Sequence, residues 1–147
     1  MPLIAPVADI GHVIQLAIAP VFLLTSVGTI IGVLANRLGR SVDRRRVLTA
    51  SIPRLDAEAA EIARREVELQ ERRIRLIYRA ITMAVLSALL VTGLIALAFV
   101  DAFIAADLGK VIAILFILAM LALVASLALF LREIFLAIDN SPRAPVI

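Results

Sequence analysis

The sequence predicts an all-α membrane protein with three transmembrane helices and a long cytoplasmic helical hairpin between the first two. One observation is composition: the 147 residues are 63% hydrophobic, the mean hydropathy is +1.06, and the apolar residues stand in blocks. The other is the charged segment 36–79, which separates the first two blocks and carries 12 of the 15 Lys and Arg residues. The length suits one domain, so we expect residues 1–147 to form a single membrane domain.

The first span is expected at about residues 10–35, which is longer than the ~20 residues that a bilayer requires. Pro2 and Pro6 precede it and disfavour a regular helix, so an irregular entry is expected there. Asp9 is then the candidate N-cap, because a carboxylate can accept hydrogen bonds from the free amides of a first helical turn.

Four small or hydroxylated residues recur along one side of this span: Thr25, Gly28, Thr29 and Gly32. The glycines stand four apart, which lets two helix backbones approach closely. We expect this face to pack against the other two helices; the alternative is the polar lining of a conduction pathway.

The charged segment opens with a candidate functional polar patch, made of Asn36, Arg37, Arg40, Asp43 and Arg44. Arginines directly beside a span are where anionic lipid headgroups dock. The hairpin turn is expected at residues 49–53, with Pro53 in the first turn of the second helix.

No proline interrupts residues 54–100, which therefore predict one long helix, half in the membrane and about 70 Å in length. Its charged half carries an apolar stripe of Leu55, Ala59, Ile62, Leu69, Leu76 and Ile77. Glu66, Gln70 and Arg73 interrupt this stripe. They are candidate contacts to the returning first helix or to another subunit, in a hairpin of coiled-coil type.

The remaining spans are expected at about residues 80–100 and 111–131. Small residues recur every four positions in the second span: Ala80, Ala84, Ala88, Thr92 and Ala96. The small face of the third span is formed by Ala119, Ala122 and Ser126. Both sets indicate close helix contacts. Asp107 is the candidate cap of the third helix, which is expected to continue to about residue 138.

Orientation follows from the basic residues. The first tail has none and the loop before the third span has only Lys110. The positive-inside rule places the N-terminus outside, the charged hairpin in the cytoplasm and the C-terminus in the cytoplasm.

Groups that carry catalysis are scarce. The chain has no cysteine, and His12 is its only histidine. Ser26 has no base within helical reach, and no G-x-x-x-x-G-K loop occurs. We therefore expect no enzyme activity, no metal and no cofactor. A nucleic-acid partner is not expected either, because the arginines lack interleaved aromatics and a folded binding module.

A family resemblance rests on residues 19–24, Ala-Pro-Val-Phe-Leu-Leu, on residues 36–38, Asn-Arg-Leu, and on Arg40 with the pair at 43–44, Asp-Arg. These residues, followed by a charged helix and two spans, resemble a bacterial family known only as domain of unknown function 2721. The resemblance covers nearly the whole chain. It implies a small inner-membrane protein with three spans and no assigned activity.

Three functions are compatible with the sequence. We expect a non-catalytic inner-membrane protein that self-associates or joins a larger membrane complex through its small-residue faces. One alternative is a homo-oligomeric ion channel lined by the first span. The other is a membrane regulator that binds anionic lipid headgroups at the inner face.

Overall fold

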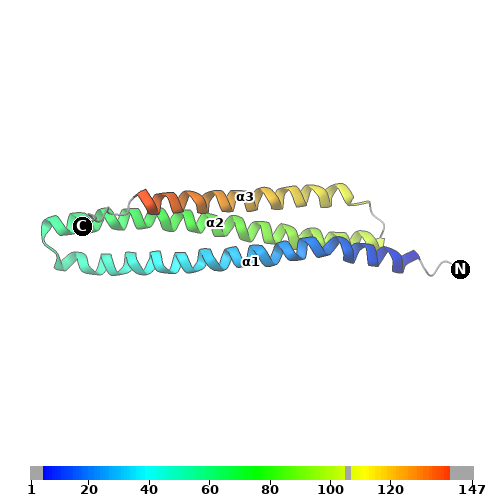
Figure 1. Cartoon of the computed structure of the whole chain (residues 1–147), viewed down its shortest axis with the longest axis horizontal. Helices are drawn as coiled ribbons and strands as arrows, with labels where there is room; N and C mark the ends of the chain where they lie inside the picture. Colours follow the sequence, from blue (N-terminus) through cyan, green and yellow to red (C-terminus); the bar gives the residue numbers. More distant parts are fainter. Residues whose placement is uncertain (1–4, 105–106, 140–147) are drawn as a thin grey trace, which may run out of the picture. The chain divides into compact units, whose positions relative to one another are not determined.

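The computed structural model describes residues 5–104 and 107–139, and every long element in them is a helix (Figure 1). The elements are α1 (Ala5–Ser51), a short 3₁₀ helix (Ile52–Arg54), α2 (Ala57–Ile104) and α3 (Gly109–Asp139). The predicted all-helical class is confirmed, as are the long uninterrupted second helix and the extension of the third to about residue 138.

Within the described residues, three helices are long and apolar enough to cross a membrane. Their most apolar 18-residue windows have mean hydropathies of 2.2, 2.6 and 3.0, yet only 6%, 22% and 22% of those windows is buried inside the protein. Apolar side chains exposed on that scale are unfavourable in water and favourable in lipid. The fold is therefore that of a multi-pass membrane protein.

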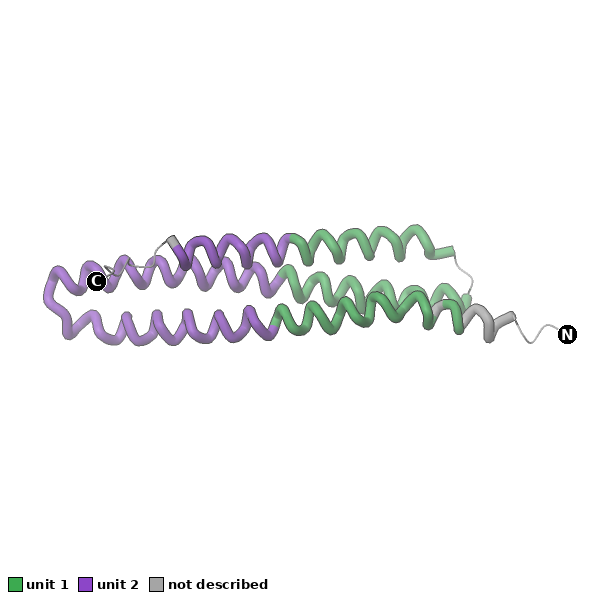
Figure 2. Tube along the Cα trace, viewed as in Figure 1, with its two compact units in different colours: residues 1–31, 83–124 green, residues 32–82, 125–147 purple. Residues whose placement is uncertain are grey.

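The chain divides into two compact units, coloured separately in Figure 2. Unit 1 comprises residues 1–31 and 83–124. A segment of each long helix contributes to its core, where Val27, Ala84 and Leu123 pack together. The Ser87 hydroxyl of α2 also donates a hydrogen bond to the Ala119 carbonyl of α3, at 2.8 Å.

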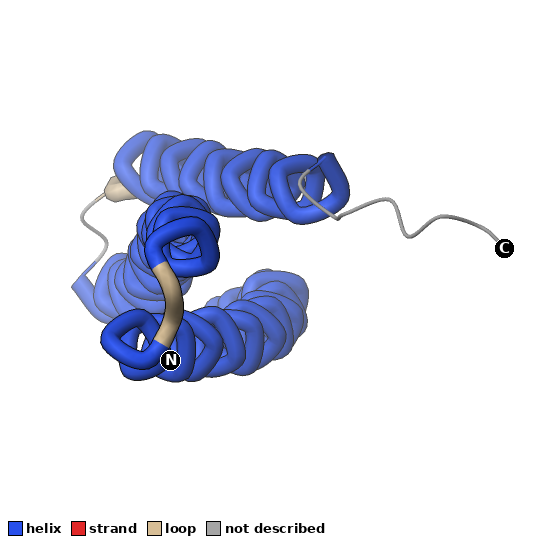
Figure 3. Tube along the Cα trace, turned by 90° about the vertical axis from the view of Figure 1, so that its left-hand side faces the viewer, coloured by secondary structure: helices blue, strands red, loops and turns tan. Residues whose placement is uncertain are grey.

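Unit 2 comprises residues 32–82 and 125–147. It contains the turn that joins α1 to α2, which faces the viewer in Figure 3. The Ser126 hydroxyl of α3 donates to the Ala80 carbonyl of α2 at 2.7 Å. Serine hydroxyls are small enough to let two backbones approach, so this contact brings α2 and α3 close together.

Buried residues recur every seven positions along each helix. They are Val27, Leu34, Ser41 and Leu48 in α1; Ala63, Gln70, Ile77, Ala84 and Val91 in α2; and Ala119, Ser126 and Glu133 in α3. A seven-residue spacing keeps one seam of a helix turned toward its neighbours. Four polar residues of unit 2 lie on this seam, Ser41, Gln70, Ser126 and Glu133, and the other seam residues are apolar.

The start of α1 differs from the expectation. The helix begins at Ala5, so Asp9 lies inside it and is not its N-cap. Pro6 falls in the first turn, where the missing amide hydrogen has no intrahelical partner to lose and the fixed φ suits the helix. Pro2 lies outside the described residues.

The turn also lies later than expected. Residues 49–51 still belong to α1, and Pro53 lies in the 3₁₀ helix before α2. The carboxylate of Asp56 accepts a hydrogen bond from the Ala59 amide at 2.8 Å, so this side chain caps α2 at its true start.

The buried face of α2 in unit 2 is rotated slightly from the predicted apolar stripe. Leu55 and Ile62 are 40% and 62% exposed, whereas Ala60 and Ala63 are buried. The ladder of small residues is correct only in part, because Ala80 and Ala84 are fully buried but Thr92 and Ala96 are exposed. Four residues turn an α-helix by 400°, so each step moves the ladder about 40° away from the buried seam.

Asp101, rather than Asp107, supports the start of α3. The Asp101 carboxylate accepts a hydrogen bond from the Leu108 amide at 3.0 Å. Asp107 has a φ of 53°, in the left-handed region that aspartate tolerates better than most residues. The loop is also shorter than predicted, because α2 continues to Ile104.

Candidate functional site

Glu133 of α3 is the centre of the charged residues in unit 2. It lies seven residues after Ser126 on the same buried seam, and its side chain is fully buried. Arg73 of α2 donates to its Oε1 from Nε at 3.1 Å and from Nη2 at 2.9 Å. Arg37 of α1 places Nη1 3.3 Å from Oε2. One carboxylate thus joins all three helices within unit 2.

Burial makes this arrangement sensitive to its partners. A carboxylate removed from water is tolerated only when opposite charges and hydrogen bonds replace its hydration. Arg73 supplies both, whereas Arg37 supplies charge alone, because Glu133 Oε2 accepts no hydrogen bond from the described residues. The Arg37 guanidinium also lies over the Phe130 ring, 5.2 Å from its centroid, which adds a cation–π contact.

A second group of ion pairs joins α1 to α2. Arg44 donates to Glu66 Oε1 from Nε at 3.0 Å and from Nη2 at 2.8 Å. Arg45 lies 4.0 Å from Glu71. These side chains are 36% to 55% exposed, so water screens them and each pair contributes little stability.

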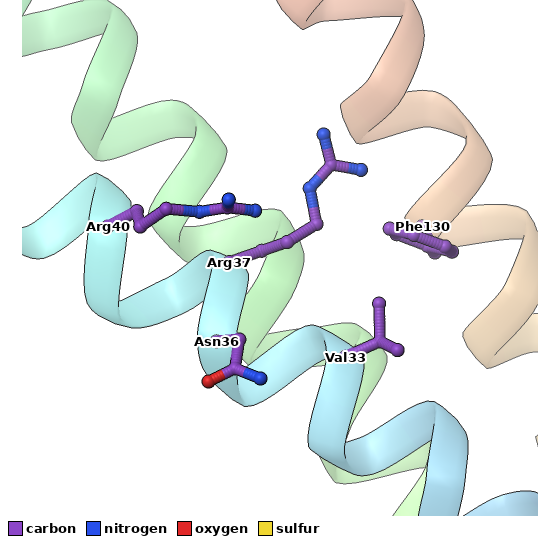
Figure 4. Close-up of a pocket in the computed structure, with 5 residues that line it drawn as sticks. All are labelled: Val33, Asn36, Arg37, Arg40 and Phe130. Carbon is purple, nitrogen blue, oxygen red and sulfur yellow. The ribbon is translucent and has the colours of Figure 1, made fainter.

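Two cavities of unit 2 are lined by arginines that pair with Glu133. One of about 300 Å³ is lined by Arg37, Arg40, Ser41, Arg44, Gln70 and Arg73. The other, of about 550 Å³, is lined by Val33, Asn36, Arg37, Arg40 and Phe130. Figure 4 shows the second cavity, with Val33 and Arg37 extending from α1 toward Phe130 of α3. We call the first the arginine cavity and the second the Phe130 cavity.

Residues 17–141 of the chain match the family DUF2721, described as a protein of unknown function. The chain belongs to this family. The match takes in most of α1 and the whole of α2 and α3, and it confirms the resemblance carried by residues 19–24 and 36–44. None of the curated proteins and none of the solved structures compared with the chain matches it.

The predicted polar patch of this DUF2721 member is partly assembled into a site. Arg37, Arg40 and Arg44 line the arginine cavity, and Asn36 lines the Phe130 cavity. Asp43 is exposed and lines neither of them.

The predicted contact residues of α2 do not share one partner helix. Glu66 reaches Arg44 of α1, and Arg73 reaches Glu133 of α3. Gln70 is 9% exposed, and its Oε1 is buried without a hydrogen-bond partner among the described residues.

The small face of α1 lies elsewhere. Thr25, Gly28 and Thr29, and Gly32 at the start of unit 2, are all exposed. The two threonine hydroxyls donate to carbonyls one turn earlier in α1, at 3.3 and 3.1 Å. Apart from the local backbone of α1 and the adjacent residues, no described atom lies within 4 Å of a Cβ placed on either glycine. The expected packing of this face against the other two helices is therefore wrong, because the seven-residue seam buries another side of α1.

Sequence reasoning placed Glu133 and Phe130 only at the end of the third span and missed their role. The available indication was spacing: Glu133 follows Ala119 and Ser126 at seven-residue intervals. A single carboxylate on the small face of an apolar helix needs a basic partner. That rule would have selected an arginine of the charged segment.

The described residues contain no group of three or more His, Asp or Glu side chains able to hold a metal ion. His12 is exposed and lines a cavity of about 590 Å³ in unit 1, whose other lining residues are mostly apolar. The chemistry available in unit 2 is therefore that of guanidinium groups, which bind carboxylates and phosphates.

Proposed function

We propose that this DUF2721 member is a non-catalytic protein of the bacterial inner membrane that self-associates or joins a larger membrane complex. The arginine-rich end of α1 and the first half of α2 form a hairpin in the cytoplasm, with the N-terminus outside and the C-terminus inside. The bias of 12 basic residues toward segment 36–79 supports this orientation. In the site, the buried carboxylate is already paired with arginines, which supports a non-catalytic role.

The observation that carries the proposal is the exposed small face of α1. Thr25, Gly28, Thr29 and Gly32 leave open space where a neighbouring helix can approach closely. In lipid, helix association depends on close packing of this kind rather than on removal of apolar surface from water. A second copy of α1, or a helix of another subunit, fits such a face.

Leucine substitution of both glycines tests the proposal. Gly28→Leu with Gly32→Leu should abolish the cross-linked oligomer in membranes while leaving the melting temperature of the protomer in detergent unchanged. Gly93→Leu in α2 is the matched control, since that position is also free of atoms within 4 Å of an added Cβ. A strictly monomeric wild-type protein, with nothing captured by cross-linking in cells, would refute self-association and complex formation together.

A second function is favoured by the arginine cavity. A membrane regulator that responds to anionic lipid needs guanidinium groups gathered at the membrane surface. Four arginines line that one cavity. If the protein bound anionic and zwitterionic lipids equally well, this second function would be excluded.

A further inference from the structure

We propose that the arginine cavity of unit 2 is a specific site for a phosphate ester anion, supplied by the headgroup of an anionic phospholipid. The inference rests on the lipid-binding function proposed above and adds to it the binding residues and the headgroup chemistry. It does not depend on self-association.

The charge balance of the cavity favours an anion. Four arginines line it. Two carboxylates offset them: Glu133, paired with Arg37 and Arg73, and Glu66, paired with Arg44. A net charge of about +2 remains, so the cavity attracts an anion, and the single negative charge of a phosphodiester would neutralise half of it.

Arg40 is the arginine left for the ligand. It lines both cavities, and no carboxylate of the described residues lies within ion-pair distance of it. The other three guanidiniums each already face a carboxylate, Arg37 and Arg73 facing Glu133 and Arg44 facing Glu66. A phosphate held by Arg40 would therefore not displace an existing pair.

The buried amide of Gln70 is a second polar group at the arginine cavity. Its Oε1 accepts no hydrogen bond from the described residues, and a buried acceptor without a donor is unfavourable by about 1–3 kcal/mol. Gln70 lines the arginine cavity, and a turn of its amide toward the cavity would let the hydroxyl of a headgroup such as phosphoglycerol donate to this oxygen while Arg40 holds the phosphate.

The Phe130 cavity indicates that the ester belongs to a lipid. It shares Arg37 and Arg40 with the arginine cavity, and its wall includes the apolar side chains of Val33 and Phe130. A free phosphate would leave that wall without a partner. A phospholipid can place its phosphate at Arg40 and its glycerol backbone against Phe130.

The experiment is a titration of the full-length protein in neutral detergent with phosphatidylglycerol, followed by native mass spectrometry. Phosphatidylcholine is the zwitterionic control, and soluble glycerol phosphate and inorganic phosphate are the other two arms. We expect phosphatidylglycerol to bind at least tenfold more tightly than each of the others. Equally tight binding of glycerol phosphate would overturn the lipid as the source. No preference over phosphatidylcholine would overturn the site.

Arg40→Gln and Arg46→Gln separate a built site from diffuse attraction. Both remove one exposed arginine from the same run of α1, but Arg46 lines neither cavity. Arg40→Gln should weaken phosphatidylglycerol binding about tenfold, and Arg46→Gln less than threefold, with unchanged melting temperatures. Equal losses of affinity in the two variants would show attraction to the general basic surface and would overturn the proposal. That outcome would leave the proposed membrane orientation untouched, because cysteine labelling tests it separately.

Discussion

The two units are built from the same three helices, but different contacts connect the helices in each. In unit 1 the core is apolar, and the one described side-chain hydrogen bond between helices is donated by Ser87. In unit 2 a similar bond, donated by Ser126, is accompanied by the buried Glu133 and its two arginines.

This difference shows that one seven-residue pattern can support two kinds of helix contact, one set by shape and one set by charge. Apolar and small residues on the seam let helices approach but allow them to slide, because many registers bury similar surfaces. A buried carboxylate between two arginines has one favourable register. We infer that the charged group of unit 2 fixes the alignment of the helices there, whereas the contacts of unit 1 are set by shape.

The largest effect is expected at Glu133. Glu133→Leu leaves Arg37 and Arg73, which are 24% and 25% exposed, without their counterion. The free energy of unfolding should fall by about 3 kcal/mol, as expected when one partner of a buried ion pair is removed. The measurement is unfolding by SDS in mixed micelles.

A matched control is Glu61→Gln, because Glu61 is 55% exposed and pairs with Arg65 at 3.4 Å. Its loss should change the unfolding free energy by less than about 0.5 kcal/mol. Adding Arg73→Met to Glu133→Leu should recover part of the stability. If Glu133→Leu and Glu61→Gln lowered the unfolding free energy by similarly small amounts, the claim that the buried carboxylate fixes the helix alignment in unit 2 would be contradicted.

An intermediate effect is expected for the two interhelical serines. Ser87→Ala in unit 1 and Ser126→Ala in unit 2 each remove a hydrogen bond to a carbonyl of another helix. Each should lower the unfolding free energy by about 1 kcal/mol. Ser26→Ala is the control, since the Ser26 hydroxyl bonds within α1 and its loss should have no measurable effect. A loss confined to Ser126 would mean that α2 and α3 do not meet as described in unit 1.

The smallest effect is expected at the exposed pair of unit 2. Glu66→Gln removes the partner of Arg44, whose side chain is 55% exposed. The unfolding free energy should change by about 0.5 kcal/mol or less, and the change should disappear in high salt. A loss as large as that of Glu133→Leu would show that exposed charges, and not the buried carboxylate, fix the alignment.

The sequence allowed the fold class to be predicted, because block hydropathy and an uninterrupted α2 depend only on local composition. The position of the buried seam was harder to predict. Alanines at 60 and 63 are buried while Ile62 is exposed, which hydrophobicity alone ranks in the opposite order. Ile62 can be exposed because a long charged helix does not need every apolar residue in its core.

The arginines and Gln70 of the candidate site were predicted from the sequence, but its buried carboxylate was not. Arg37, Arg40 and Arg44 were selected from their density beside a span, and Gln70 and Arg73 from their place within an apolar stripe. Glu133, the partner of Arg37 and Arg73, is 96 and 60 residues away from them along the chain. No local pattern encodes which helix returns beside another, so that pairing required the three-dimensional structure.

Cysteine labelling in cells tests the central claim, the membrane orientation, most directly, since the natural chain has no cysteine. Glu58→Cys and Lys110→Cys place one thiol each at exposed positions near the start of α2 and of α3. A membrane-impermeant maleimide should label position 110 in intact cells, and position 58 only after the inner membrane is opened. Labelling of position 58 in intact cells, or recovery of the protein without membranes, would contradict the account.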